Sequence, residues 1–556
     1  MADNKFRTQE QVFNEMHREL RRWNPEVPES PERLDPILKI LLQLYSTQIS
    51  RVDKKIDMVY EKASTSLIRS LCPESKRWPV PAFTVVRCVP TDPVVDVDQH
   101  TRFFYKEERD GGQTFFFSPH RKEKLVAAEV KHIYLKIDGA IVDLSPSSVE
   151  STSTHTTMQV SLPRGKTAQI YLAVDHAGSA KNFENANIFI NGIPDALKQL
   201  RWGQWYPGSK EGRFHEDSGF CPGLTTSIEM LFNRENGPVN WGGLRSSADL
   251  FKPLENHFIF LPEIFVSTWE VGPPQKELYD RMLDYGITIE EGDDRFYWIR
   301  IDLPEGGNKH SMQSPFEIYF NCLVAINKNE LTLFKHTGGN RLVEIELPED
   351  ISNILDILKV VDSNGREYIP SHRISTDQSQ KFYSLEEKNN HLVLWFDFTG
   401  SIDLPPDSIT INYSVTAGTE ANGIEAGKIA ELYENHPGIV SVASILPVKG
   451  AIPAKTDKQI LTEVSARLRS RDRALSFQEI SRWAMTFDPR ILRAECQNGV
   501  ERTDHGVRRC IVVTIGIKAD DFYSNDEVEL LRIRLNNFLK SRSPVNTQFA
   551  IKIEKK

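Results

Sequence analysis

Tyr413-Ser414-Val415-Thr416-Ala417-Gly418-Thr419-Glu420-Ala421-Asn422-Gly423-Ile424-Glu425-Ala426-Gly427 is the stretch of sequence that is most informative about the fold. Its first residues predict a strand, and its glycines predict that the strand runs out into a turn. We therefore expect a strand and turn connector over residues 411–455, followed by a C-terminal module over residues 456–556. No residue pattern in this module indicates catalysis, and we interpret it as a part that pairs with another protein.

The C-terminal module has the pattern of two helices, two strands, a third helix and a final strand. Capping boxes at Thr456–Gln459 and Ser476–Glu479 predict the start of the first two helices, and Asn525 can cap the third. This ααββαβ order predicts a small sheet with helices on one face. The side chains expected to pack inside it include Trp483, Phe487, Leu531, Leu535 and Phe538.

Charge is distributed unevenly along the chain. The net charge of −9 argues against general nucleic-acid binding, which needs a basic surface. Residues 456–556 are nevertheless basic, with 19 Lys and Arg against 14 Asp and Glu. The densest basic patch is Arg467, Arg469, Arg471 and Arg473, at a predicted helix end. Two interpretations stay open: these arginines complement the helix dipole, or they face an acidic partner surface.

Length and composition limit the class of protein. The 556 residues are too many for one hydrophobic core and suggest three or four domains. No apolar run is long enough for a transmembrane helix, and the first residues lack the apolar stretch of a secretory signal, so we expect a cytoplasmic protein. The six cysteines are far apart and predict neither a zinc site nor a disulfide framework.

The N-terminal segment, residues 1–75, is predicted to be helical. An apolar register with alternating steps of four and three begins at Leu38 and is sustained over about four heptads, which is typical of a coiled coil. A helix of roughly 35 residues would span about 50 Å, more than a small domain needs. We expect part of the seam to meet a partner helix, although packing on its own chain stays open. The seam residues are Leu38, Leu42, Tyr45, Ile49, Val52, Ile56 and Val59.

The central part of the chain is β-rich. Short runs such as Phe83–Val89, Gln169–Val174 and His391–Phe396 alternate with turns rich in Pro, Gly, Asn and Asp. Such a succession predicts antiparallel sandwiches or barrels. We expect one β-domain over residues 76–205 and a second over residues 206–410. The fold class predicted for the whole chain is multidomain α+β.

The sequence contains no familiar catalytic motif, and we expect neither enzymatic activity nor a cofactor. The best candidate for a metal site is a group of four residues near His215. Neighbouring residues on a strand point to opposite faces, so a polar loop is the favoured interpretation. An acidic run could hold calcium, although a charged hairpin turn is favoured. Four aromatic residues could form a carbohydrate platform, although core packing is favoured. The three groups are, in order, His215, Glu216, Asp217 and Cys221; Glu290, Glu291, Asp293 and Asp294; and Trp202, Trp205, Tyr206 and Trp241.

Motifs at both ends of the chain carry a resemblance to a known family. The N-terminal motifs are Asp35–Leu38, Leu67–Pro73 and Trp78–Val86; the C-terminal ones are Tyr413–Gly427, Ser476–Ile480 and Pro544–Ile551. Together they cover about 200 residues and resemble the baseplate wedge subunits of contractile injection systems. The N-terminal motifs are similar to the TssF family of type VI secretion. The C-terminal ones are similar to the baseplate J-like wedge proteins of contractile phages and extracellular particles.

The resemblance implies a structural role and a set of partners. The N-terminal seam would join helices of a second wedge copy or paralogue and of a small TssG-like protein in a core bundle. The C-terminal module would pair with a neighbour, so that six wedges close into a ring around the spike hub. A sheath-adaptor baseplate protein would be a further partner. The residues assigned to packing or ring contacts in this module are Trp483, Phe487, Leu531, Leu535, Phe538, Arg467 and Arg471.

Two other functions stay open at this point. One is a multidomain carbohydrate-binding or carbohydrate-processing β-protein, which would need a surface cleft with paired carboxylates. The other is a cytosolic scaffold that dimerises through its coiled coil. Type VI secretion, an extracellular particle and a phage are also not distinguished by these residues.

Overall fold

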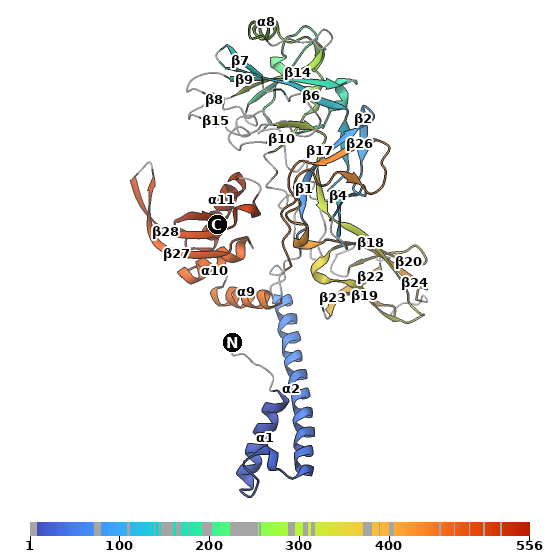
Figure 1. The fold of residues 1–556 in the computed structure, drawn as a ribbon, viewed down its shortest axis with the longest axis vertical. Coiled ribbons are helices and arrows are strands. Elements are labelled where there is room, and N and C mark those ends of the chain that lie inside the picture. Colours follow the sequence, from blue (N-terminus) through green and yellow to red (C-terminus); the bar gives the residue numbers. More distant parts are fainter. Residues whose placement is uncertain are drawn as a thin grey trace. The chain divides into compact units, whose positions relative to one another are not determined.

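The computed structural model divides the chain into two units. Unit 1 comprises Met1–Arg77 and Lys455–Asp472, and unit 2 comprises Trp78–Ala454 and Arg473–Lys556 (Figure 1). The structure describes residues 8–71, 79–107, 112–137, 139–143, 145, 160–162, 168–176, 178–191, 203–222, 254, 257–286, 295–303, 310–312, 317–370, 381–388, 390–399, 405–454, 457–471, 473–488, 490–503, 506–522 and 525–555.

Unit 1 is helical. Helix α1 begins with a capping box, in which Thr8 Oγ1 accepts from the Gln11 amide and Gln11 Oε1 accepts from the Thr8 amide. The long helix α2 begins at Pro36, and Asp35 Oδ1 accepts from the amides of Ile37 and Leu38. Both α1 and α9 pack against α2. The elements are α1 (Gln9–Trp23), η1 (Pro31–Arg33), α2 (Pro36–Leu71) and α9 (Asp457–Ser470).

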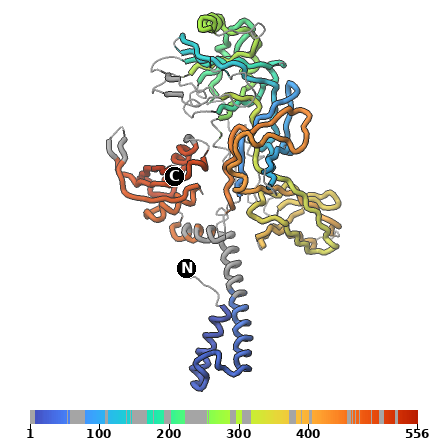
Figure 2. Tube along the Cα trace, viewed as in Figure 1, coloured from blue at the N-terminus to red at the C-terminus, as the bar shows by residue number. Residues whose placement is uncertain are grey.

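A six-stranded sheet of unit 2 collects strands from distant parts of the sequence. Its order is β25-β3-β4-β17-β1-β26, and all its pairings are antiparallel. Figure 2 shows the blue, yellow-green and orange segments of the chain side by side in this sheet. Its strands are β1 (Phe83–Pro90), β3 (Phe103–Lys106), β4 (Thr114–Pro119), β17 (Cys322–Asn327), β25 (Glu431–Leu432) and β26 (Ile439–Ser444), with the pair β2 (Val94–Val97) and β5 (Glu123–Val126) and the turn η8 (Gly418–Ala421) beside it.

A second six-stranded sheet is built around β14, which pairs with β9, β11 and β13. Alternate residues of β14 serve two apolar clusters, because successive side chains on a strand point to opposite faces. The strands are β6 (Ala128–Ile137), β7 (Ala140–Asp143), β9 (Ala168–His176), β11 (Gln204–Pro207), β13 (Val271–Gly272) and β14 (Phe296–Leu303). Smaller elements nearby in the chain are β8 (Val160–Leu162), β15 (His310–Met312), β10 (Asn187–Asn191), β12 (Phe258–Phe260), β16 (Glu317–Phe320), η3 (Ala180–Phe183), η4 (Glu216–Ser218), α7 (Glu263–Val266) and α8 (Lys276–Asp284).

A seven-stranded sheet is formed by one continuous stretch of the chain. Its order is β18-β24-β20-β21-β22-β23-β19, and its core contains only residues of this stretch. It is inserted between β17 and the glycine-rich turn that follows Val415. The elements are β18 (Asn329–His336), β19 (Leu342–Asp350), η7 (Ile351–Asn353), β20 (Ile354–Asp362), β21 (Glu367–Pro370), β22 (Lys381–Lys388), β23 (His391–Asp397) and β24 (Ser408–Val415).

The C-terminal part of unit 2 is a three-stranded sheet with two helices. β27 and β28 form an antiparallel pair, and β29 joins β28 in parallel after the crossover helix α11. Helix α10 begins with the capping box of Ser476 and Glu479. The elements are α10 (Phe477–Phe487), β27 (Arg493–Thr503), β28 (Gly506–Ile517), η9 (Ala519–Asp521), α11 (Asn525–Arg542) and β29 (Phe549–Lys555).

The fold is multidomain α+β, and most of the described residues outside unit 1 belong to β-sheets. The coiled-coil character of the N-terminal helices stays a prediction, since unit 1 contains one long helix beside the shorter α1 and α9. Strands before and after residue 205 pair with each other, as β1 does with β17 and β9 with β14. The two predicted β-domains therefore share sheets, and α9 belongs to unit 1; the predicted domain limits themselves stay a prediction.

Candidate protein-interaction surfaces

Helix α2 has a buried face and, opposite to it, an exposed face that is apolar. The face toward α1 includes Leu42, which is 7% exposed, and the buried Ser46 and Ser50, each one helical turn further on. Small serines at these positions leave room for close approach of the neighbouring helix, and Ser46 Oγ donates to the carbonyl of Gln43 at 2.9 Å. On α1, Val12 and His17 are buried. This face is completed within unit 1.

The opposite face of α2 is apolar and exposed. Its residues recur with the spacing of one helical face, three or four positions apart, and are mostly about half exposed. Contiguous exposed apolar patches of this kind mark sites of protein interaction, and burying each such side chain is worth about 1.5–3 kcal/mol. We call this set the exposed apolar face; it comprises Ile37, Ile40, Leu41, Leu44, Tyr45, Val52 and Ile56.

The predicted seam lies between these two faces. Leu42 belongs to the buried face, Leu38 and Ile49 are half-buried, and Tyr45, Val52 and Ile56 belong to the exposed apolar face. The side chain of Val59 lies outside the described residues. Sequence reasoning missed the four residues at its N-terminal end, Ile37, Ile40, Leu41 and Leu44, although their three- and four-residue spacing was a usable signal. The interface role of the seam stays a prediction.

The apolar residues predicted to pack in the C-terminal module lie in its interior. Trp483, Leu531 and Leu535 are buried, and Phe487 and Phe538 pack against the same cluster. The guanidinium carbon of Arg542 lies 4.8 Å from the centroid of the Trp483 ring and 3.9 Å from that of Phe538. These side chains stabilise the module by packing in its core. Their direct participation in contacts between neighbouring wedges stays a prediction.

The two arginines predicted for the ring contact lie at the end of α9. Arg471 is exposed and has a φ of 49°, in the left-handed region where helices commonly end. Arg467 lies within α9, and its side chain is outside the described residues. The assignment of both arginines to a contact between wedges stays a prediction.

A buried ion cluster in the C-terminal module was not foreseen from the sequence. Arg490 donates to Asp488 Oδ2 at 2.9 Å and to Glu527 Oε1 at 2.6 Å, and its guanidinium carbon lies 4.2 Å from the Phe522 ring centroid. Burial opposes the charge of Arg490, but the two carboxylates outweigh it and raise its pKa. The cluster connects the loop between α10 and β27 to α11. No sequence motif predicts it.

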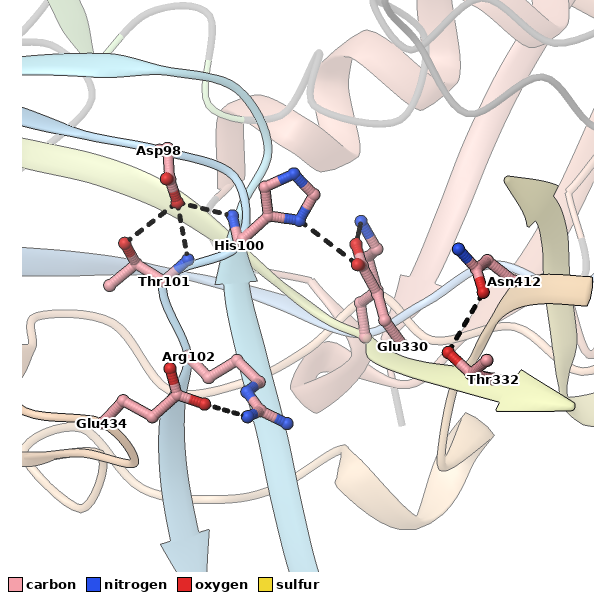
Figure 3. A network of polar contacts seen from close by, with 9 residues as sticks. Asp98, His100, Thr101, Arg102, Glu330, Thr332, Asn412 and Glu434 are labelled. Carbon is pink, nitrogen blue, oxygen red and sulfur yellow. Dashed lines mark hydrogen bonds and ion pairs between the residues drawn. The ribbon is translucent and has the colours of Figure 1, made fainter. Parts of the chain in front are cut away.

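A polar network lies where the turn after β2 meets β18 (Figure 3). His100 Nδ1 is 3.2 Å from Glu330 Oε2, and Lys328 Nζ is 2.6 Å from Glu330 Oε1. The turn is ordered by Asp98 Oδ1, which accepts from the amides of His100 and Thr101 at 2.8 and 3.0 Å. Burial opposes the charge of Glu330, but Lys328 and His100 outweigh it, so its pKa lies below the ordinary range.

Next to this network, an aromatic cluster borders the six-stranded sheet that contains β3, β4 and β25. The guanidinium carbon of Arg102 lies 4.5 Å from the Tyr433 ring centroid, and the guanidinium pairs with Glu434. Tyr433 meets Phe104 and Phe116 edge to ring at centroid distances of 6.1 and 5.1 Å. Tyr433 remains 52% exposed, so this cluster covers a sheet edge rather than a closed core.

The residues considered for metal or sugar binding have other surroundings. Glu216 accepts from Arg300 at 3.0 Å, and Trp205 is fully buried in a core cluster. The guanidinium carbon of Arg300 lies 4.5 Å from the centroid of the Tyr206 ring. Among the described residues no group of three or more His, Cys, Asp or Glu side chains could hold a metal ion. Trp202, Trp241, Glu290, Glu291, Asp293 and Asp294 lie outside the described residues.

A helix must be both long and apolar to cross a bilayer. Within the part of the chain that the structure describes, no helix combines the length and the hydropathy needed to cross one.

Comparison with known proteins gives structural neighbours only. No protein-family model matches the sequence, and no curated protein matches it. Several solved structures are similar to the chain in three dimensions, three baseplate chains among them. One is a chain of the type VI secretion TssK-TssF-TssG baseplate subcomplex, with 13% identity, a TM-score of 0.47, and coverage of 93% of this chain and 96% of that chain.

The other two neighbours also come from baseplates. A chain of the type VI secretion baseplate complex has 12% identity, a TM-score of 0.36, and coverage of 98% of this chain and 96% of that chain. A chain of the anti-feeding prophage baseplate has 8% identity, a TM-score of 0.33, and coverage of 97% and 70%. The structural neighbours thus come from the kinds of assembly whose proteins the sequence motifs resemble. Because every TM-score lies below 0.5, we draw no function from them.

Proposed function

We propose that this chain is a structural wedge component of the baseplate of a contractile, phage-tail-like injection machine. In this role it joins wedges into a ring around the spike hub and couples the baseplate to contraction of the sheath. The proposal rests on the end motifs described above and on one structural observation, the exposed apolar face of α2.

The exposed apolar face supports an assembly role because unit 1 leaves it uncovered. Ile37 is 71% exposed, Leu44 57% and Tyr45 60%, while the opposite face of the same helix is already packed against α1. Within the described part of unit 1, both α1 and α9 pack against α2, yet the residues of the exposed apolar face remain largely accessible. A helical partner from another subunit would cover this face. This face is therefore the surface on which a core bundle would form.

The proposed partners differ in the surface that they use. A second wedge copy or paralogue and a small TssG-like protein would pack on α2. A neighbouring wedge would meet the C-terminal module, whose sheet and two helices enclose a core cluster of their own. A sheath-adaptor protein and the spike hub would complete the assembly. Neither a cofactor nor nucleic acid has a part in this function.

The direct test is reconstitution of the core bundle. The full chain is co-expressed with the small helical protein encoded in the same gene cluster, and the complex is isolated through a tag on that partner. Leu41→Asp combined with Leu44→Asp should abolish co-purification, because both side chains would carry charge into the apolar contact. Gln43→Asp is the matched control, since Gln43 is exposed and lies outside the exposed apolar face. Equal recovery of all three chains with the partner would contradict the proposal.

The ring is tested separately by electron microscopy of the assembled particle. Wild-type chain should give closed rings with the other products of the cluster. A purified chain that stays monomeric in the presence of every tail-machine component would contradict the proposed function. So would a gene neighbourhood devoted to glycan use, with no sheath, inner tube or spike hub.

A further inference from the structure

The seven-stranded sheet is connected to the rest of unit 2 at two closely spaced chain crossings. The chain enters it after Asn327, the last residue of β17, and leaves it at Thr416, directly after β24. Every residue of its apolar core belongs to this stretch. The sheet, which we call the arm, therefore has the architecture of an inserted domain that can keep its fold while its orientation changes.

One side chain links the two crossings just before the antiparallel pairing of Asn329 with Val415 begins. Asn327 Oδ1 accepts from Thr416 Oγ1 at 2.7 Å and from the Ala417 amide at 2.8 Å, while its Nδ2 donates to the Phe116 carbonyl at 2.9 Å. Asn327 is buried, so these bonds form where water does not compete. The entry strand, the exit strand and β4 thus share a single amide group.

A second contact lies just beyond the crossings, on the first residues of the arm. Glu330 of β18 binds His100 of the β2–β3 turn at 3.2 Å and Lys328, at the crossing, at 2.6 Å. The amide of Lys328 donates to the Phe116 carbonyl at 3.1 Å, which fixes Lys328 to the six-stranded sheet. Figure 3 shows the side chain of Glu330 facing His100 of the turn. Glu330 therefore links the first strand of the arm to the β2–β3 turn and to Lys328 at the crossing.

We propose that residues 327–330 and 415–418 form a polar pivot, in which Glu330 is a strap that holds the arm in one orientation. Polar contacts suit such a joint, because hydrogen bonds are directional and their loss exposes groups that water can satisfy, whereas an apolar contact would resist opening. Removal of the Glu330 charge frees the arm to turn about Asn327 without unfolding it. This inference does not depend on the proposed baseplate function.

Two measurements on the full chain test the pivot. Hydrogen exchange reports on the amides of Lys328 and Ala417, whose acceptors are Phe116 O and Asn327 Oδ1. Spin labels on non-natural residues at Asp92 and Ser384, both exposed, report the orientation of the arm. Glu330→Gln should accelerate exchange at the pivot about tenfold or more and broaden the distance distribution, while exchange in β20 and β23 stays unchanged.

Two further variants complete the experiment. Asn327→Ala should accelerate pivot exchange at least as much, because it removes the acceptor of both exit-strand bonds. Thr332→Ala is the matched control: Thr332 lies on β18 and donates to Asn412 at 3.1 Å inside the arm, so neither readout should change. An unchanged distance distribution in Glu330→Gln would overturn the inference. Equal acceleration in β20 and β23 would also overturn it, because the arm would then unfold rather than pivot.

Discussion

Leu42 and Tyr45 lie three residues apart on α2, yet they have opposite surroundings. Leu42 is 7% exposed on the side that packs against α1, and Tyr45 is 60% exposed on the other side. Their neighbour Leu41 is 45% exposed and belongs to the same face as Tyr45. The same helix therefore has one face that stabilises unit 1 and one that is available to a partner. Substitutions on the two faces should therefore affect stability differently.

The first prediction concerns the stability of unit 1. Leu42→Ala should destabilise the packing of α1 on α2 by about 2–4 kcal/mol, because it leaves a cavity in a completed contact. Leu41→Ala should cost less than about 1 kcal/mol. Hydrogen exchange of the α1 amides is the measurement, since a helix of this length is marginal without packing. We expect exchange to accelerate by about 30-fold or more in Leu42→Ala, and equal rates in both variants would contradict the assignment of the faces.

The second prediction compares two glycines in the connector. Gly423 and Gly450 both have a positive φ, of 90° and 88°. A Cβ at Gly423 would meet nothing within 4 Å, whereas a Cβ at Gly450 would lie 2.3 Å from Phe83 Cε1. Gly423→Ala should cost about 1–2 kcal/mol from backbone strain alone. Gly450→Ala should cost a further 1–3 kcal/mol or so from overpacking. Calorimetric unfolding of the two variants checks the order, and a less destabilised Gly450→Ala would contradict it.

Local sequence patterns were sufficient for individual elements. Helix α1 lies within the N-terminal segment that was predicted to be helical, and strands form around Phe83, Gln169 and His391 where the β-rich runs predict them. The Ser476–Glu479 capping box is confirmed by its two reciprocal hydrogen bonds. These features depend on residues a few positions apart, and such short-range interactions can be recognised in a single sequence.

Long-range pairing could not be obtained in the same way. Val86 pairs with Leu323 on one side and Ser444 on the other, and no local signal connects three positions so far apart. The residues of α2 that stay exposed could not be identified from the heptad pattern for a related reason. A heptad pattern does not distinguish the apolar residues that pack within unit 1 from those that stay exposed. The packing of α1 on α2 makes this distinction. The arm and its pivot likewise follow from contacts between distant segments.

A third prediction concerns the buried ion cluster of the C-terminal module. Glu527→Gln should destabilise the module by about 3–5 kcal/mol, because Arg490 would keep a buried charge with one of its two carboxylates removed. Glu529→Gln is a suitable control, since Glu529 is about half exposed and pairs with Arg532 along the helix. Protection of the β28 amides against hydrogen exchange reports the stability of the module. Similar protection in both variants would show that the cluster has no stabilising role.

A fourth prediction uses His120, which is 9% exposed next to β4. Burial, with the nearby charges of Arg121 and Lys328, lowers the pKa of His120 to about 4. The unfolded chain binds this proton near pH 6.5, and the folded chain binds it only near pH 4. The contribution of His120 to stability is therefore complete above about pH 6.5 and is lost as the pH falls toward 4. The total change is about 3 kcal/mol.

Glu123 contributes with the opposite sign. Burial raises its pKa despite the ion pair with Arg121, so the folded chain binds this proton before the unfolded chain does. Its contribution is present at low pH and is lost as the pH rises through its folded pKa.

Calorimetry of the wild type alone would therefore mix the effects of His120 and Glu123. The informative quantity is the difference between the wild type and His120→Gln at each pH from 7 to 4, in which Glu123 cancels. We expect this difference to change by about 3 kcal/mol toward acid, in favour of the variant. A difference that is constant with pH would show that His120 titrates normally in the folded chain.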